Sequence, residues 1–181
     1  MHPLRLWVVG AALLLAQTTR PPARTVPPYR GLTPGLSYRA FVARASALAD
    51  HDALACKTSR RTAALMECGV TIRDPVDGAR FYLSGHFVDQ RADIIALYDS
   101  AGFHGTNGPE LVARRQRDMT KVFGRPRRKR AGMWKWSFGR QEVRLSWRSR
   151  GAARWVAIQL TDWDVMARAR RYLKPAAKRK P

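Results

Sequence analysis

Acidic residues are scarce in this sequence. Only 13 of its 181 residues are Asp or Glu, against 34 Lys and Arg, and the formal net charge is +21. A chain of that charge attracts nucleic acid, anionic lipid, the phosphates of lipopolysaccharide or acidic proteins. The alternative is a soluble protein that happens to be basic and binds no polyanion. The charge therefore indicates a class of partner and nothing about the fold.

The patterns of common catalytic sites are also missing. The sequence has no Gly-x-Ser-x-Gly element and no glycine-rich phosphate loop that ends in Lys-Ser or Lys-Thr. Beyond the first residues, the histidines are the scattered His51, His86 and His104, and no nucleophile, base and acid stand in a recognisable arrangement. We therefore expect no catalytic residue, no cofactor and no metal site. A hydrolase with an unrecognised site at His86 and His104 is the enzymatic alternative.

An apolar run near the start of the chain is too short to cross a membrane. Leu6–Ala16 follows the single cation Arg5 and carries no charge. Eleven helical residues rise about 16 Å, roughly half of a bilayer core. That length is typical of a secretory signal. Residues 1–16 are therefore predicted to be an export signal, which places the protein in the periplasm or outside the cell.

Alternatives to a cleaved signal remain open. Ala16 suits the residue before a cleavage site, but Leu14 is larger than the small residue usual two positions earlier. An uncleaved signal would retain the protein at the membrane. An ordinary buried first helix is the structural alternative. No cysteine follows the run, which argues against a lipid-anchored N-terminus.

Cysteine occurs only twice, at Cys56 and Cys68. An oxidising compartment favours one disulfide between them. The alternatives are two free buried thiols, or a metal site formed by His51, Asp52 and Cys56, which lacks a recognised zinc spacing and a fourth ligand. The disulfide is the prediction.

Proline concentrates before the predicted domain. Five prolines lie within Arg20–Gly35, which shows no hydrophobic periodicity. Because proline removes backbone donors and favours extended chain, residues 17–35 are predicted to be a disordered linker. Residues 36–173 then form one domain, with halves at about 36–100 and 107–173, followed by a basic tail at 174–181.

Hydrophobic periodicity within the domain predicts three helices and six strands. The expected helices are Leu36–Ala49, 109–123 and Asp162–Leu173, the last with Trp163, Met166 and Leu173 facing inward. The expected strands are Ala64–Ile72, 81–88, Ala92–Tyr98, Met133–Phe138, Glu142–Ser149 and Arg154–Thr161. We therefore predict an α+β domain of two helix–three-strand units, a possible duplication, in which an antiparallel sheet carries its helices on one face.

The second half carries a short signature, Phe123-Gly124-Arg125-Pro126 after a helix and Trp134-Lys135-Trp136 in the next strand. It resembles the small outer-membrane-assembly lipoproteins and is similar to the β-lactamase-inhibitor-protein fold. The resemblance covers about 50 residues and implies a non-enzymatic, protein-binding module of the bacterial envelope. The chain lacks the lipid-anchoring cysteine of that lipoprotein family and is far more basic.

The last three strands present one apolar and one basic face. Alternation places Trp134, Trp136 and Phe138 toward the core. The opposite face carries Lys135, Arg144, Arg148 and Trp155, which could hold phosphates and stack on bases or sugars. A connector loop with Arg127, Arg128, Lys129 and Arg130 adds cations. The alternative is that Trp155 packs under arginine stems, or that the other half covers this face.

These observations together predict an exported, non-enzymatic module that binds a protein or an anionic envelope surface, either lipid or lipopolysaccharide. A nucleic-acid-binding basic protein is the first alternative, and the hydrolase is the second. The sequence predicts no small-molecule cofactor and no particular oligomeric state.

Overall fold

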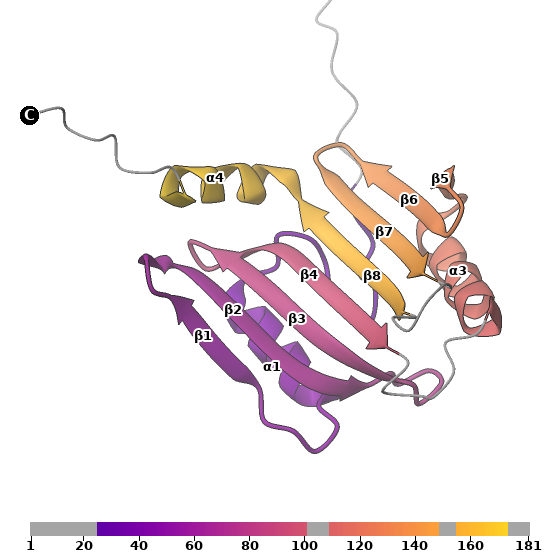
Figure 1. Cartoon of the computed structure of the whole chain (residues 1–181), viewed down its shortest axis with the longest axis horizontal. Coiled ribbons are helices and arrows are strands. Elements are labelled where there is room, and N and C mark those ends of the chain that lie inside the picture. The colour runs from indigo at the N-terminus through magenta and orange to yellow at the C-terminus, as the bar shows by residue number, and fades with distance from the viewer. Residues whose placement is uncertain (1–24, 101–108, 149–154, 174–181) are drawn as a thin grey trace, which may run out of the picture.

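A computed structural model describes residues 25–100, 109–148 and 155–173 of the chain. These residues form three helices and one antiparallel sheet of eight strands, in the order β1-β2-β3-β4-β8-β7-β6-β5 (Figure 1). The predicted α+β class is confirmed. The segments expected to be the export signal and the basic tail, residues 1–16 and 174–181, lie outside the described residues.

The first unit is a helix followed by a four-stranded meander. Its elements are α1 (Tyr38–Leu48), β1 (Ala55–Ser59), β2 (Thr62–Arg73), β3 (Arg80–Val88) and β4 (Arg91–Ser100). Ser37 caps α1, because its hydroxyl accepts a hydrogen bond from the backbone N–H of Ala40.

The second unit repeats this order and adds a closing helix. Its elements are α3 (Pro109–Phe123), β5 (Arg127–Arg130), β6 (Met133–Phe138), β7 (Gln141–Arg148), β8 (Trp155–Asp162) and α4 (Trp163–Leu173). Each unit therefore has four strands where the sequence predicts three. The common origin of the two units stays a prediction.

Pairing of β4 with β8 joins the two meanders into one sheet. Gly85, Ile95 and Leu160 are directly opposite one another in β3, β4 and β8, and Val143 and Trp136 continue the row through β7 and β6. Directly opposed residues share a face of a sheet. One apolar face therefore runs across both units.

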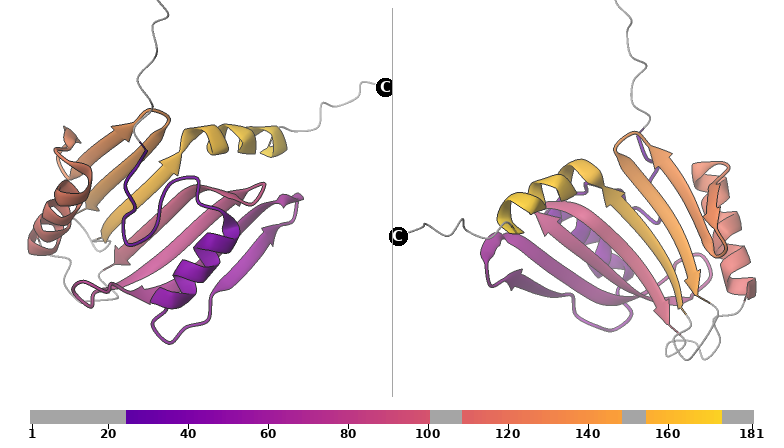
Figure 2. Two further views of the ribbon diagram at one scale, coloured as in Figure 1. Left: turned by 180° about the vertical axis from the view of Figure 1, so that it is seen from behind. Right: turned by 45° about the horizontal axis from the view of Figure 1, so that its top comes forward.

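Helices α1 and α3 cover this apolar face, which we call the helix face. The ring of Phe41 in α1 lies 5.1 Å from that of Phe87, between centroids, and Phe123 in α3 lies 5.8 Å from Trp136. Figure 2 (left), which views the sheet from behind, shows α1 across β2 and β3 and α3 toward the other end. We call the opposite side of the sheet the open face.

Helix α4 packs on the open face. Its buried residues Val165 and Ala169 contact Val88, with Leu65 and Tyr172 beside them. The right-hand view of Figure 2 shows α4 in front of the sheet and α1 behind it. The expectation that all helices share one face is therefore wrong for α4.

The inward side of α4 also differs from the prediction. Trp163 and Leu173, expected to be buried, are 40% and 51% exposed. Val165, Ala169 and Tyr172, which are spaced at i, i+4 and i+7, pack against the sheet instead. The hydroxyl of Tyr172 donates a hydrogen bond to Asp89 at 2.6 Å. This hydrogen bond ties the end of α4 to the β3–β4 turn.

The predicted boundary at residue 36 is too late. Val26, Tyr29 and Leu32 are buried in the main core, and Tyr29 and Leu32 exchange both backbone hydrogen bonds at 2.9 Å. The Arg44 side chain of α1 donates to the carbonyl of Arg30. The described part of the expected linker, residues 25–35, therefore belongs to the domain, because its apolar residues supply core contacts despite the prolines.

A buried ion network also holds this segment. Arg30 pairs with Asp74 at 3.0 Å and with Asp118 of α3 at 3.2 Å. Arg115 pairs with Asp74 at 2.9 Å and Asp77 at 3.1 Å. The network links the N-terminal segment, the β2–β3 turn and α3 on the helix face.

Candidate polyanion-binding site

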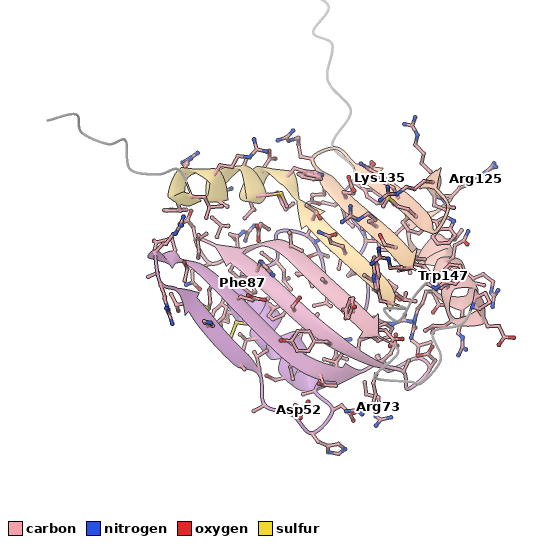
Figure 3. All side chains as sticks on the ribbon, in the orientation of Figure 1. Asp52, Arg73, Phe87, Arg125, Lys135 and Trp147 are labelled. Atoms are coloured by element: carbon pink, nitrogen blue, oxygen red, sulfur yellow. A yellow bond between two sulfur atoms is a disulfide. The ribbon has the colours of Figure 1, made fainter. Side chains whose placement is uncertain are left out.

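The predicted basic residues of the second unit lie together on the open face. The register places Arg127, Lys135 and Arg144 directly opposite one another in β5, β6 and β7. Arg148 is directly opposite Trp155 in β8, along the same face. Figure 3, drawn in the orientation of Figure 1, labels Lys135 on β6. The alternation that the sequence predicts for these strands is confirmed.

The cations of this row differ in how they are neutralised. Lys135 forms an ion pair with Glu142, so its charge is compensated. Arg144 donates a hydrogen bond to the side-chain oxygen of Gln159, which carries no charge. Arg144 therefore keeps its full positive charge at the centre of the face.

A shallow pocket of about 530 Å³ lies beside Arg144. The residues that line it include the arginines Arg130, Arg144 and Arg148, the indole of Trp155 and the buried hydroxyl of Ser146. We call this group the arginine cup. Ser146 lies opposite Met133 and Ala157, two positions from both Arg144 and Arg148 along β7, and it lines the same pocket as the three arginines.

The three guanidinium groups of the cup have no carboxylate partner among the residues that the structure describes. Arg144 bonds a neutral amide, and no ion pair involves Arg130 or Arg148 in that part of the chain. Arg130 and Arg148 are exposed to solvent. Planar guanidinium groups match phosphate and carboxylate oxygens in two-point hydrogen bonds. The cup can therefore accept a multivalent oxyanion.

An aromatic platform adjoins the cup. The ring of Trp155 lies 6.1 Å from that of Tyr98 in β4, between centroids. Tyr98 is directly opposite Ala157, so both rings belong to the open face. Among the described residues Trp155 thus contacts a neighbouring ring, and its half-exposed surface remains beside Arg148.

The turn between β5 and β6 fixes one wall of the cup. Gly132 has a φ of +72°, and a Cβ there would lie 2.6 Å from the carbonyl oxygen of Trp147. The N–H of Trp147 donates to the Gly132 carbonyl at 2.8 Å. This close approach requires glycine, and it holds the β5–β6 hairpin with Arg130 against β7.

The remaining predicted basic residues are placed only in part. Arg127–Arg130, expected in a connector loop, form strand β5, because they pair with β6. Arg128 is opposite Trp134, while the side chains of Arg128 and Lys129 lie outside what the structure describes. Arg127 is exposed and shares the open face with Lys135.

The predicted disulfide between Cys56 and Cys68 is confirmed (Figure 3). The two residues are directly opposite in β1 and β2, with Cα atoms 4.0 Å apart. Both sulfurs are therefore committed to one covalent bond, and neither the free-thiol nor the metal alternative at Cys56 applies. Within the described ranges, no group of three metal-ligating side chains converges.

His86, the first residue of the hydrolase alternative, lies on the open face of β3. Its Nε2 is 3.5 Å from Oε1 of Glu67 in β2. His104, the second, lies outside the described residues. The structure thus leaves the hydrolase pair untested and shows His86 beside the carboxylate of Glu67.

The sequence did not predict the places of Ser146 and Gln159 beside Arg144. Ser146 and Gln159 alternate onto the open face of β7 and β8, so periodicity could have placed them there.

Comparison with known proteins identifies no relative of this chain. Within the described chain, none of the helices combines the length and the apolar character that a membrane span requires. No family model matches the sequence, and no curated protein or solved structure is significantly similar to it. The resemblance of the second half to envelope lipoproteins therefore stays a prediction.

Proposed function

We propose that this chain is an exported, non-enzymatic module that binds a phosphate-bearing envelope surface through the arginine cup. The observation that carries the proposal is the group of three guanidiniums around Ser146 without a carboxylate partner in the described chain. Like charges that share a small area repel one another, and a bound phosphate relieves that repulsion. Each cation near an anionic membrane contributes about 1 kcal/mol.

The cup lies within a wider basic surface. Arg127 extends it along β5, and Trp155 with Tyr98 supplies rings that can rest against sugars or lipid headgroups. The expected export segment favours anionic lipid or lipopolysaccharide over nucleic acid, because those polyanions occur in the envelope. Nucleic acid, which uses the same guanidinium and ring chemistry, is the alternative that the experiment separates.

Two triple variants of equal net charge test the site. The cup variant carries R130Q, R144Q and R148Q. The helix-side control carries R39Q, R117Q and K121Q, three exposed cations of α1 and α3 without a described ion pair. Each variant loses three positive charges, so the two differ only in where the charge is removed.

Binding of the full chain to anionic phosphatidylglycerol vesicles at 50 mM salt is the readout, with phosphatidylcholine vesicles as the neutral reference. Three lost contacts of about 1 kcal/mol each predict roughly 100-fold weaker binding for the cup variant. The control should lose far less. Equal losses in both variants would show that net charge alone causes binding and would reject the site.

A single-stranded oligonucleotide at the same salt identifies the partner class. The proposal predicts tighter binding to the anionic vesicles. If the oligonucleotide binds more tightly and the cup variant abolishes that binding, the partner is nucleic acid and the envelope assignment is wrong. Fractionation of the native host tests export: recovery in the cytosol would contradict it, and recovery in the envelope or medium would support it.

A further inference from the structure

A second pocket, of about 390 Å³, lies on the open face of the first unit, away from the arginine cup. Strands β1, β2 and β3 form its floor, and the end of α4 forms one side. Its apolar lining includes Leu65, Val88, Ala169 and Leu173, and its titratable lining includes Glu67, His86 and Asp93. We call it the carboxylate pocket. A volume of this size accommodates a small organic molecule.

Asp93 reaches this pocket because of a β-bulge. His86 pairs with Ile94 and Phe87 pairs with Ala92, so Asp93 is the extra residue of β4 and has no partner in β3. Bulges of this kind re-aim a side chain relative to the regular alternation. The result is a carboxylate that lines the pocket while its residue is only 8% exposed.

The carboxylate of Asp93 has no cationic partner within ion-pair distance in the described chain. Its Oδ1 accepts a hydrogen bond from the N–H of Ile94 at 2.9 Å. Burial raises the pKa of Asp93, and the nearby His86 offsets this effect only in part. A buried carboxylate without a counter-charge is costly, and a ligand that brings a positive charge removes that cost.

The neighbours of Asp93 define the shape of such a ligand. Leu65 and Val88 supply an apolar wall, and Leu173, half exposed at the mouth, extends it. Glu67 with His86 adds a second acidic position nearer to solvent. An apolar body can therefore lie along the wall while its charged end points at Asp93.

Two cations at the rim restrict the charge of the ligand. Lys57 and Arg60, both exposed, line the pocket from the β1 side, and Lys57 is directly opposite Glu67. They would repel a second positive charge on a bound molecule. A polyamine is therefore disfavoured, and a ligand with one positive charge is favoured.

We propose that the carboxylate pocket binds a small organic monocation, an ammonium or guanidinium group on an apolar chain or ring, with the charge against Asp93. This binding is independent of the arginine cup, whose residues lie on β5, β7 and β8. It gives the chain a small-ligand site in addition to its proposed polyanion-binding surface.

Hexylamine is a suitable probe, with 1-hexanol as its neutral counterpart and spermidine as the polycation. Binding to the full chain is measured by amide chemical-shift titration at pH 7. Removing one charged hydrogen-bond partner predicts at least about tenfold weaker hexylamine binding in Asp93→Asn. Asp52→Asn, which removes an exposed acid outside this pocket, is the matched control and should bind as the wild type does.

Leu173→Ala supplies a second variant that keeps the carboxylate and changes an exposed residue. It should weaken hexylamine binding severalfold, which keeps the proposal testable if Asp93→Asn perturbs the fold. The proposal predicts weaker binding of both hexanol and spermidine than of hexylamine. It is overturned if Asp93→Asn binds hexylamine normally, or if spermidine binds more tightly than hexylamine.

Discussion

Arg115 in α3 and Asp74 in the β2–β3 turn form an ion pair in the interior of the protein. Nη1 of Arg115 lies 2.9 Å from Oδ2 of Asp74, and neither side chain is more than 1% exposed. The same guanidinium lies 4.6 Å from the ring centroid of Phe81. Because the two residues belong to different units, the pair connects the units across the helix face, in addition to the β4–β8 pairing.

Removal of Asp74 should destabilise the protein strongly. Asp74→Ala leaves Arg115 buried without its main partner, and breaking a buried pair in this way costs about 3–5 kcal/mol. Asp164→Ala is the control, because the Arg140–Asp164 pair is exposed on both sides and should contribute about 1 kcal/mol or less. Urea unfolding measures both. Similar losses in the two variants would contradict the structural role of the buried network.

The disulfide should stabilise the first unit. Cys56 and Cys68 are 12 positions apart, and closure of a loop of this length restricts the unfolded chain by about 3 kcal/mol in the loop-entropy model. Reductant should therefore lower the free energy of unfolding of the wild type by that order. The double variant C56S/C68S should start lower and be insensitive to reductant. A wild type that is equally insensitive would contradict the bond.

Gly132 should be the less replaceable of two turn glycines. Gly132 and Gly139 both have positive φ, so alanine at either costs about 1–2 kcal/mol in the left-handed region. Only at Gly132 does the added Cβ meet a backbone carbonyl, that of Trp147. Gly132→Ala should therefore lose more stability than Gly139→Ala, and it should also weaken vesicle binding because Arg130 moves. Equal effects of both variants would contradict the fixed wall of the cup.

The ionised carboxylate of Asp93 should lower the free energy of unfolding at neutral pH. Because burial raises its pKa in the folded state, the folded protein holds that proton more tightly than the unfolded chain does. The bound proton therefore stabilises the folded state fully below the unfolded pKa, near 3.9, and this contribution is lost as pH rises through the folded pKa. Asp93→Asn should therefore match or exceed wild-type stability at pH 7.

The advantage of Asp93→Asn should shrink in acid, where Asp93 is protonated in both states. Urea unfolding of the two proteins at pH 7 and below pH 4 measures the difference. A variant that is less stable than the wild type at pH 7, with no loss in acid, would show that the carboxylate is stabilising. The carboxylate pocket would then be part of the fold rather than a place for a ligand.

Much of this fold is readable from alternation along the sequence. Apolar positions two residues apart mark β2, β3 and β4 and also β6, β7 and β8, and the predicted core position of Trp136 is confirmed. The strands β1 and β5 were missed because they are short edge strands, largely exposed or uniformly cationic, and carry no apolar alternation. Their structure comes from pairing with a neighbour, which local sequence does not encode.

The sites were less predictable than the strands. The alternation of side chains along a strand is enough to predict the face that carries Lys135, Arg144, Arg148 and Trp155. The pairing of Lys135 with Glu142, which neutralises one of these cations, depends on register between strands. The carboxylate pocket depends on a bulge in β4 and on the face of the sheet against which α4 packs. The sequence of α4 has two apolar stripes, and it does not show which of them is buried.

Chemical-shift mapping can show whether a phosphate group binds at the arginine cup. The full chain is titrated at low salt with a soluble short-chain phosphatidylglycerol below its micelle concentration. Phosphate binding at the cup predicts saturable shifts that are largest at Ser146, Arg148 and the indole of Trp155 and small along α1. Uniform shifts over the basic surface, or the largest ones on the helix side, would contradict a phosphate site in the cup.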